Sequence, residues 1–222
     1  MDQLEIRTAA QTLELRASSN GPGTLAGYAA VFNRYSQNLG GFVEQVDPVA
    51  FNKSLADKVP VMCRGNHEDE MFLGATWSDT LRLSVDGTGL LYEDDLPDTM
   101  PGRDFAILAK RGDVKWSSFA FRTIDDAWSV TEQGFPLRTL LQVLLVDVAP
   151  VNSPAYLDTT AAMRSFDAYR AAANPPSGDL DNPERIGDMV ADALRSAGKD
   201  GQRDTHPSAA ARRRRLDLLA KQ

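Results

Sequence analysis

Apolar and polar residues alternate along Val114–Arg122, and this period of two predicts a β-strand. Ser118 lies on one side of the predicted strand, whereas Ser117 lies on the other side with Phe119 and Phe121. A hydroxyl in such an apolar setting costs free energy unless it is hydrogen-bonded. The strand therefore presents two serines, and only one of them can face a given partner.

Further strands are expected wherever apolar residues alternate or form short runs. The stretch 140–151 is too apolar for a surface strand and should be buried on both faces. Residues 81–92 form the clearest hairpin, with its turn at 86–89. Polar and turn-forming residues predict an irregular interval over 125–136. Other strands are expected around 13–15 and over 24–33 and 59–64.

Two helices are indicated by their end signals. Asp47 is a candidate N-cap because Pro48 follows it at the first helical position. Helical spacing also runs through 100–111, and Gly112 provides an end signal. Together with the strands, these helices predict an α+β chain that is mainly β.

Composition narrows the class of protein. The 222-residue chain carries a formal net charge of −7 with a pI near 4.9, so we expect no specific nucleic-acid binding. The single cysteine, Cys63, cannot form an internal disulfide and suits a reducing compartment. We find neither a secretory leader nor an apolar run of the roughly 20 residues that span a bilayer, so no membrane association is expected.

The amino-acid composition changes after about residue 162, where large apolar residues become scarce. We therefore expect an N-terminal segment with a weak strand over 1–23, a folded domain over 24–165 and a largely flexible tail over 166–222. Helical spacing within the tail predicts a short helix around 184–196.

A basic cluster, Arg212–Arg215, lies near the end of the expected tail. Such a cluster is usually a solvated charged segment. It could instead make an electrostatic contact with an acidic partner or nucleic acid.

Three candidate side chains lie at the edges of predicted strands. Ser118 provides a hydroxyl, His67 an imidazole 51 residues upstream, and Asp147 a carboxylate 29 residues downstream. These groups are the parts of a serine-nucleophile triad, in which the imidazole acts as general base and the carboxylate orients it. No metal or cofactor is needed for this chemistry. Ser117 is the competing nucleophile.

The third member of the triad has alternatives at this point. Glu68 is a second candidate, and Asp147 could instead pair with Arg122 or Arg138. His67 could also be a surface histidine among acids. A metal site built on His67 and its acidic neighbours is disfavoured, because no other histidine or cysteine has suitable spacing.

Four segments resemble, in order, the prohead (capsid maturation) serine proteases of tailed bacteriophages. The first joins GYAAVFN to FVEQVDPVAF within 27–51, and the second, 59–76, holds the Asn-His pair. The third is WSSFAF at 116–121, with Ala120 where the family usually has Gly. The fourth, VDVAPVNSPAY, covers 146–156, with Ala149 where Ser is usual.

The resemblance implies an antiparallel β-barrel of the herpesvirus-assemblin type with a few packed helices. It implies a serine endopeptidase with Ser118, His67 and Asp147 in the catalytic roles. Backbone N–H groups near Phe119 and Ala120 are candidate oxyanion donors, with help from Arg122. The implied partner is a major capsid protein with its scaffold segment, inside the immature capsid in the bacterial host cytoplasm. Self-cleavage and self-association are further expectations.

Two other classes of protein remain as alternatives. The chain could be a non-catalytic assembly or scaffold-binding protein that keeps the protease fold. It could also be an unrelated β-rich binding domain, in which case Ser118 and His67 would lie more than about 6 Å apart.

Overall fold

The structure, a computed structural model, describes residues 4–19, 21–153 and 159–172. This part of the chain is mostly β-sheet. The strands are β1 (Leu4–Thr12), β2 (Glu14–Arg16), β3 (Thr24–Val31), β4 (Val43–Val46), β5 (Met62–Arg64), β6 (Phe72–Ala75), β7 (Leu81–Val85), β8 (Gly89–Asp95), β9 (Trp116–Val130) and β10 (Pro136–Val151). The helices are α1 (Asn52–Ala56), α2 (Met100–Arg111) and α3 (Thr159–Ala172), with 3-10 turns η1 (Gly65–His67), η2 (Asp69–Met71) and η3 (Thr76–Ser78).

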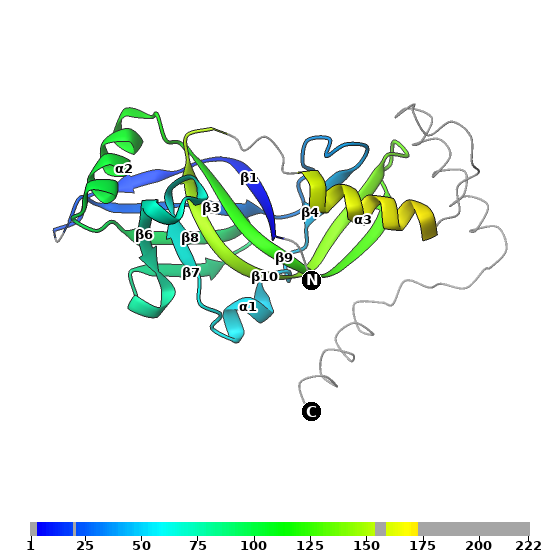
Figure 1. Cartoon of the computed structure of the whole chain (residues 1–222), viewed down its shortest axis with the longest axis horizontal. Helices are drawn as coiled ribbons and strands as arrows, with labels where there is room; N and C mark the ends of the chain where they lie inside the picture. Colours follow the sequence, from blue (N-terminus) through cyan, green and yellow to red (C-terminus); the bar gives the residue numbers. More distant parts are fainter. Residues whose placement is uncertain (1–3, 20, 154–158, 173–222) are drawn as a thin grey trace.

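These strands form two sheets (Figure 1). The first has the order β1-β9-β10-β5-β6, with β4 also paired to β10, and the second has the order β2-β3-β8-β7. Within the described residues the expected antiparallel barrel is not found, because the sheets stay open and β4 and β5 run parallel to β10. The mixed pairing follows from the length of β10. Its start, at Leu137, pairs with β4, and its end, at Asp147, pairs with β5.

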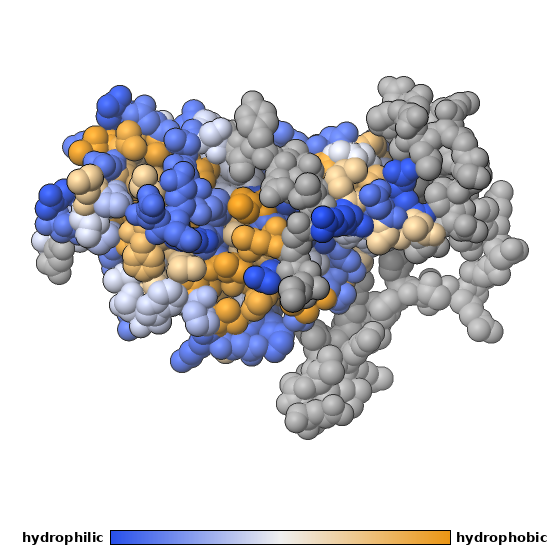
Figure 2. All heavy atoms as spheres, viewed as in Figure 1, coloured by the Kyte–Doolittle hydropathy of each residue, from blue (hydrophilic) through white to orange (hydrophobic). Residues whose placement is uncertain are grey.

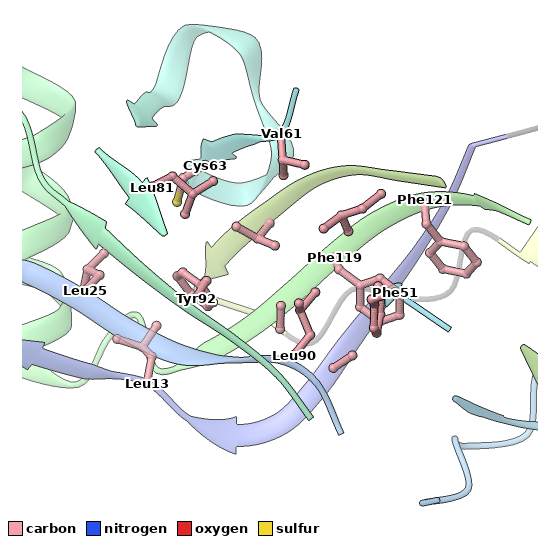
Figure 3. Packing of buried hydrophobic residues seen from close by; sticks show 14 of the residues in the cluster. Leu13, Leu25, Phe51, Val61, Cys63, Leu81, Leu90, Tyr92, Phe119 and Phe121 are labelled. Carbon is pink, nitrogen blue, oxygen red and sulfur yellow. The ribbon is translucent and has the colours of Figure 1, made fainter. Parts of the chain in front are cut away.

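Apolar side chains from both sheets pack into one core between them (Figure 3). Phe119 and Phe121 on β9 stack with ring centroids 4.9 Å apart, and Phe51 meets Phe119 edge-on at 5.5 Å. Tyr92 on β8 closes the core from the second sheet and is fully buried. The core-facing side of the sheet that holds Ser118 is therefore stabilised by close aromatic packing.

Elements with strong local signals form as expected. The hairpin of β7 and β8 turns at residues 86–88, and α2 begins after Thr99, whose hydroxyl accepts a hydrogen bond from the Gly102 N–H. Gly112 ends α2 with φ of 85°, a left-handed conformation that suits glycine.

Two of the expected elements differ in extent. The Asp47 carboxylate accepts from the Val49 N–H at 3.0 Å, so Asp47 closes a turn, and α1 begins only at Asn52. The expected irregular interval is also wrong over residues 125–130. There β9 continues and pairs with β10, because β9 is an edge strand beyond its pairing with β1 and its exposed side chains can be polar.

Both ends of the described chain contribute to the body of the fold. β1 pairs with β9 from Leu4 onward and β2 pairs with β3, so residues before 24 contribute a strand to each sheet. α3 crosses residue 165 and packs Phe166 against Trp128, with centroids 5.6 Å apart. The helix expected around 184–196 and the Arg212–Arg215 cluster lie outside the described residues.

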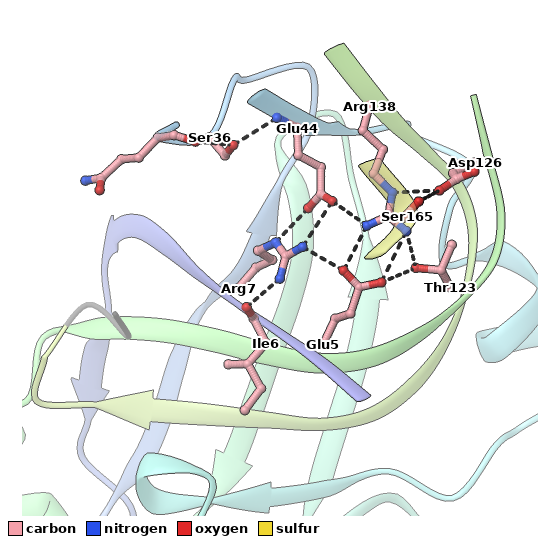
Figure 4. Close-up of polar contacts among 10 residues, drawn as sticks. Glu5, Ile6, Arg7, Ser36, Glu44, Thr123, Asp126, Arg138 and Ser165 are labelled. Atoms are coloured by element: carbon pink, nitrogen blue, oxygen red, sulfur yellow. Dashed lines mark hydrogen bonds and ion pairs between the residues drawn. The ribbon is translucent and has the colours of Figure 1, made fainter. Parts of the chain in front are cut away.

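A buried ionic network fastens β1 to β4, β9 and β10 (Figure 4). Arg7 bonds Glu44 at 2.8 Å and Glu5 at 2.7 Å, and Arg138 bonds the same two carboxylates at 2.9 and 2.8 Å. Arg138 also bonds Asp126 at 2.6 Å. Burial alone would raise the pKa of Glu5, but Arg138 and Arg7 lower it, so the carboxyl stays ionised.

Candidate active site

Ser118 lies on β9, in the middle of the first sheet and between β1 and β10. Its Oγ is 2.7 Å from Nε2 of His67 and 2.8 Å from the carbonyl oxygen of Arg7 on β1. Ser118 has no exposed surface. The hydroxyl carries a single proton, so it can donate to the imidazole or to the carbonyl, but not fully to both.

Ser117 points to the opposite face of the sheet, as the alternation along β9 requires. Its Oγ lies 3.1 Å from the hydroxyl of Tyr92 inside the core. The two neighbouring serines therefore have separate partners, and Ser118 is the one that contacts His67.

His67 belongs to η1, the tight turn that follows β5. Asn66 and His67 both have positive φ, 53° and 62°, a conformation that costs free energy for residues other than glycine. The Asn66 side-chain oxygen accepts a hydrogen bond from the Asn152 N–H at 3.2 Å, which fastens this turn to the end of β10. The strained turn aims the imidazole over β10 toward Ser118.

Asp147 lies on β10 and is fully buried. Its Oδ1 is 2.7 Å from Nδ1 of His67, and its Oδ2 accepts from Nε of Arg64 at 2.7 Å. Nη2 of Arg64 contacts the same oxygen. Sequence reasoning missed Arg64, although a buried carboxylate requires a cation and Arg64 is only three residues before His67.

The other candidates, Glu68 as third member and Arg122 or Arg138 as partner of Asp147, lie elsewhere. Glu68 is exposed and follows η1, whereas it is Asp147 that meets the imidazole. Arg138 belongs to the separate buried network, and Arg122 lies opposite Leu144 rather than Asp147.

The imidazole of His67 thus contacts the Ser118 hydroxyl on one side and the Asp147 carboxylate on the other, each at 2.7 Å. In this order the imidazole can accept the hydroxyl proton while the carboxylate stabilises the charge that forms on the ring. The arrangement is one that can activate a serine for attack on a carbonyl carbon.

The candidate oxyanion donors fit this arrangement less well. Phe119 and Ala120 lie where β9 is paired on both sides, so their N–H groups point into the ladders. Arg122 is four residues from Ser118, roughly 13 Å along the strand.

Within the described residues, no group of three or more His, Cys, Asp or Glu side chains is arranged to hold a metal ion. In the same part of the chain, no helix is long and apolar enough to cross a bilayer.

Comparison with known proteins places the chain among its relatives. No curated protein sequence matches it. Among solved structures, the capsid assembly protease gp21 of bacteriophage T4 is similar with a TM-score of 0.47 and 15% identity, over 68% of this chain and 98% of that one. The family model for the caudovirus prohead serine protease matches residues 11–172. This match covers most of the chain, and it shows that the chain belongs to the caudovirus prohead serine protease family.

Proposed function

We propose that this protein is a serine endopeptidase that removes the scaffold segment of a major capsid protein, and cleaves itself, while the capsid matures. The proposal is supported by two observations. The chain belongs to this protease family, and His67 contacts both Ser118 and Asp147. The enzyme would act inside the prohead in the host cytoplasm, where self-association of the packaged chains is also expected.

In the proposed reaction the Oγ of Ser118 attacks the carbonyl carbon of the scissile peptide bond. His67 takes the hydroxyl proton and passes it to the amine when the C–N bond breaks, leaving an acyl-enzyme ester. Water then gives a proton to His67, its oxygen attacks the ester, and the proton returns to Ser118 as the acid leaves. Asp147 stabilises the imidazolium in both steps.

The surface on the Ser118 side of the sheet offers apolar contacts to a substrate. Along β1, Ile6 lies opposite Ala120 and Leu4 opposite Arg122, and Leu4 is 39% exposed. Figure 2 shows hydrophobic residues in the middle of the face that presents β9 and β10. Because Ser118 itself is buried, a substrate carbonyl can reach its Oγ only when neighbouring atoms move aside.

The proposal is tested by co-expressing the chain with the major capsid protein of the same phage and measuring intact masses. Wild type and Ser117→Ala should both trim the capsid protein, whereas Ser118→Ala should not. Ser117→Ala is the matched control because it removes the neighbouring buried hydroxyl, which contacts Tyr92 instead of His67. Loss of cleavage in Ser117→Ala alone would overturn the choice of nucleophile.

A serine-directed fluorophosphonate separates the protease from a non-catalytic assembly protein with the same fold. The protease should react at Ser118, and the mass of the labelled peptide identifies the site. If capsids assemble while wild type neither cleaves nor reacts, the non-catalytic function is correct.

A further inference from the structure

We propose that Arg64 is a positioning residue, which fixes the Asp147 carboxylate so that Oδ1 faces His67. The inference rests on the proposed function, because it concerns how the imidazole beside Ser118 is held. Arg64 does not contact Ser118, and its effect on the reaction is transmitted through Asp147.

The contacts divide the two carboxylate oxygens between two partners. Nε and Nη2 of Arg64 both bond Oδ2 of Asp147, and this leaves Oδ1 for Nδ1 of His67. A carboxylate that is held by one hydrogen bond can still rotate about its Cβ–Cγ bond. The planar guanidinium fixes that rotation, because its two N–H donors have fixed directions.

The backbone explains why one short segment supplies both partners. β5 runs parallel to β10 with Met62 opposite Asp147, so Arg64, the last residue of β5, lies just beyond the carboxylate. η1 then turns the chain back and brings His67 to the other oxygen. The segment 64–67 therefore encloses Asp147, whose side chain is fully buried.

The outer side of the guanidinium is held as well. Nη1 of Arg64 contacts the carboxylate of Asp69, whose side chain is 89% exposed. Burial lowers the pKa of Arg64, but hydrogen bonds with Asp147 and Asp69 more than offset this and leave the pKa raised. Arg64 thus stays charged between one buried and one exposed carboxylate.

A double-mutant cycle on the full-length chain tests the inference, with the rate constant of fluorophosphonate inactivation as the readout. Arg64→Gln should lower this rate constant about 100-fold, since a small misplacement of a reacting group has an effect of that size. Arg64→Lys keeps the charge but loses the planar pair of N–H donors, so we expect it to lower the rate constant about tenfold. In the Asp147→Asn background, Arg64→Gln should cost less than about threefold, because the carboxylate it positions is gone.

The control is Arg82→Gln, which removes a guanidinium that bonds Asp95 through both Nη atoms in the second sheet. It should leave the rate constant within about twofold of wild type. Equal losses from Arg64→Gln in both backgrounds would show a merely structural role and overturn the inference. If Arg64→Gln does not fold, Arg64→Lys completes the same cycle.

A second readout does not depend on any reaction at Ser118. In Ser118→Ala, the His67 Nδ1 proton bonded to Asp147 should give a proton NMR resonance downfield of the amides. Arg64→Gln should broaden or remove it, and Arg82→Gln should keep it. A resonance unchanged by Arg64→Gln would overturn the inference, whereas absence of cleavage by wild type would overturn only the proposed function.

Discussion

The Nδ1 atom of His67 lies 2.7 Å from Oδ1 of Asp147, although 80 residues separate the two along the chain. The contact exists because β5 pairs in parallel with the end of β10, and η1 turns His67 back over it. Orientation of a catalytic imidazole depends on such a contact.

Asp147→Asn should therefore lower the fluorophosphonate inactivation rate by roughly 10³- to 10⁴-fold, because the amide favours the wrong imidazole tautomer. Glu68→Gln removes an exposed carboxylate one residue from His67 and should leave the rate within about twofold. A large loss in Glu68→Gln with a small one in Asp147→Asn would reverse the assignment of the third member.

Asn66 combines a left-handed backbone with a side-chain bond to the Asn152 N–H. Asn66→Ala should destabilise the protein by about 1–2 kcal/mol, because alanine is strained at positive φ and cannot accept the hydrogen bond from the Asn152 N–H. Asn66→Gly removes the strain and loses only the bond, so its effect on urea unfolding should be smaller. Equal stability of the two variants would show that the backbone conformation contributes nothing.

Asp94 is fully buried on β8, and neither of its carboxyl oxygens has a hydrogen-bond partner among the described residues. Burial raises its pKa to about 7, even though the nearby Cys63 thiol opposes the shift. Gly74 allows the close approach, since a Cβ there would meet Oδ1 at 2.0 Å.

The raised pKa of Asp94 predicts how stability changes with pH. The folded carboxyl keeps its proton up to about pH 7, whereas the unfolded one releases it near 3.8, so this group's contribution to stability falls as pH rises between those values. Asp94→Asn should remove that fall and be more stable than wild type at pH 8, by roughly 4 kcal/mol. Urea unfolding of both proteins at pH 5 and pH 8 measures this difference in stability. If the free energy of unfolding changes equally with pH in wild type and Asp94→Asn, the raised pKa of Asp94 is contradicted.

Arg138 is 2% exposed and bonds three carboxylates of the buried network. Arg138→Met should destabilise the protein by about 3–5 kcal/mol, because Glu5 and Glu44 would keep only Arg7 as a buried cation. Arg16→Met, which breaks a half-exposed pair with Glu93, should cost less than about 1 kcal/mol in the same urea experiment.

The elements that could be predicted from the sequence are those whose signals are local. α2 covers the predicted range 100–111 and ends at Gly112 as indicated, and the β7–β8 hairpin forms around its expected turn. The expected helix start at Asp47 was wrong, because an Asx-type cap can close a turn without continuing into a helix.

The long-range ionic contacts could not be predicted. Glu5 and Arg138 are 133 residues apart, and nothing near either residue indicates the other. Asp147 and Arg64 are 83 residues apart, and the only local signal for this pair was the position of Arg64 three residues before His67. Such pairs form only when strand order is set, and strand order depends on packing across the whole core.

The sequence by itself determined that Ser117 and Ser118 face opposite sides of a strand, since successive side chains alternate by backbone geometry. Its motifs also indicated the protease family, which the match over residues 11–172 shows. Only the tertiary structure decided that the sheets stay open, and that Asp147 rather than Glu68 meets His67. The physical reason is that periodicity acts between neighbouring residues, whereas the partner of a buried charge is chosen by contacts between distant strands.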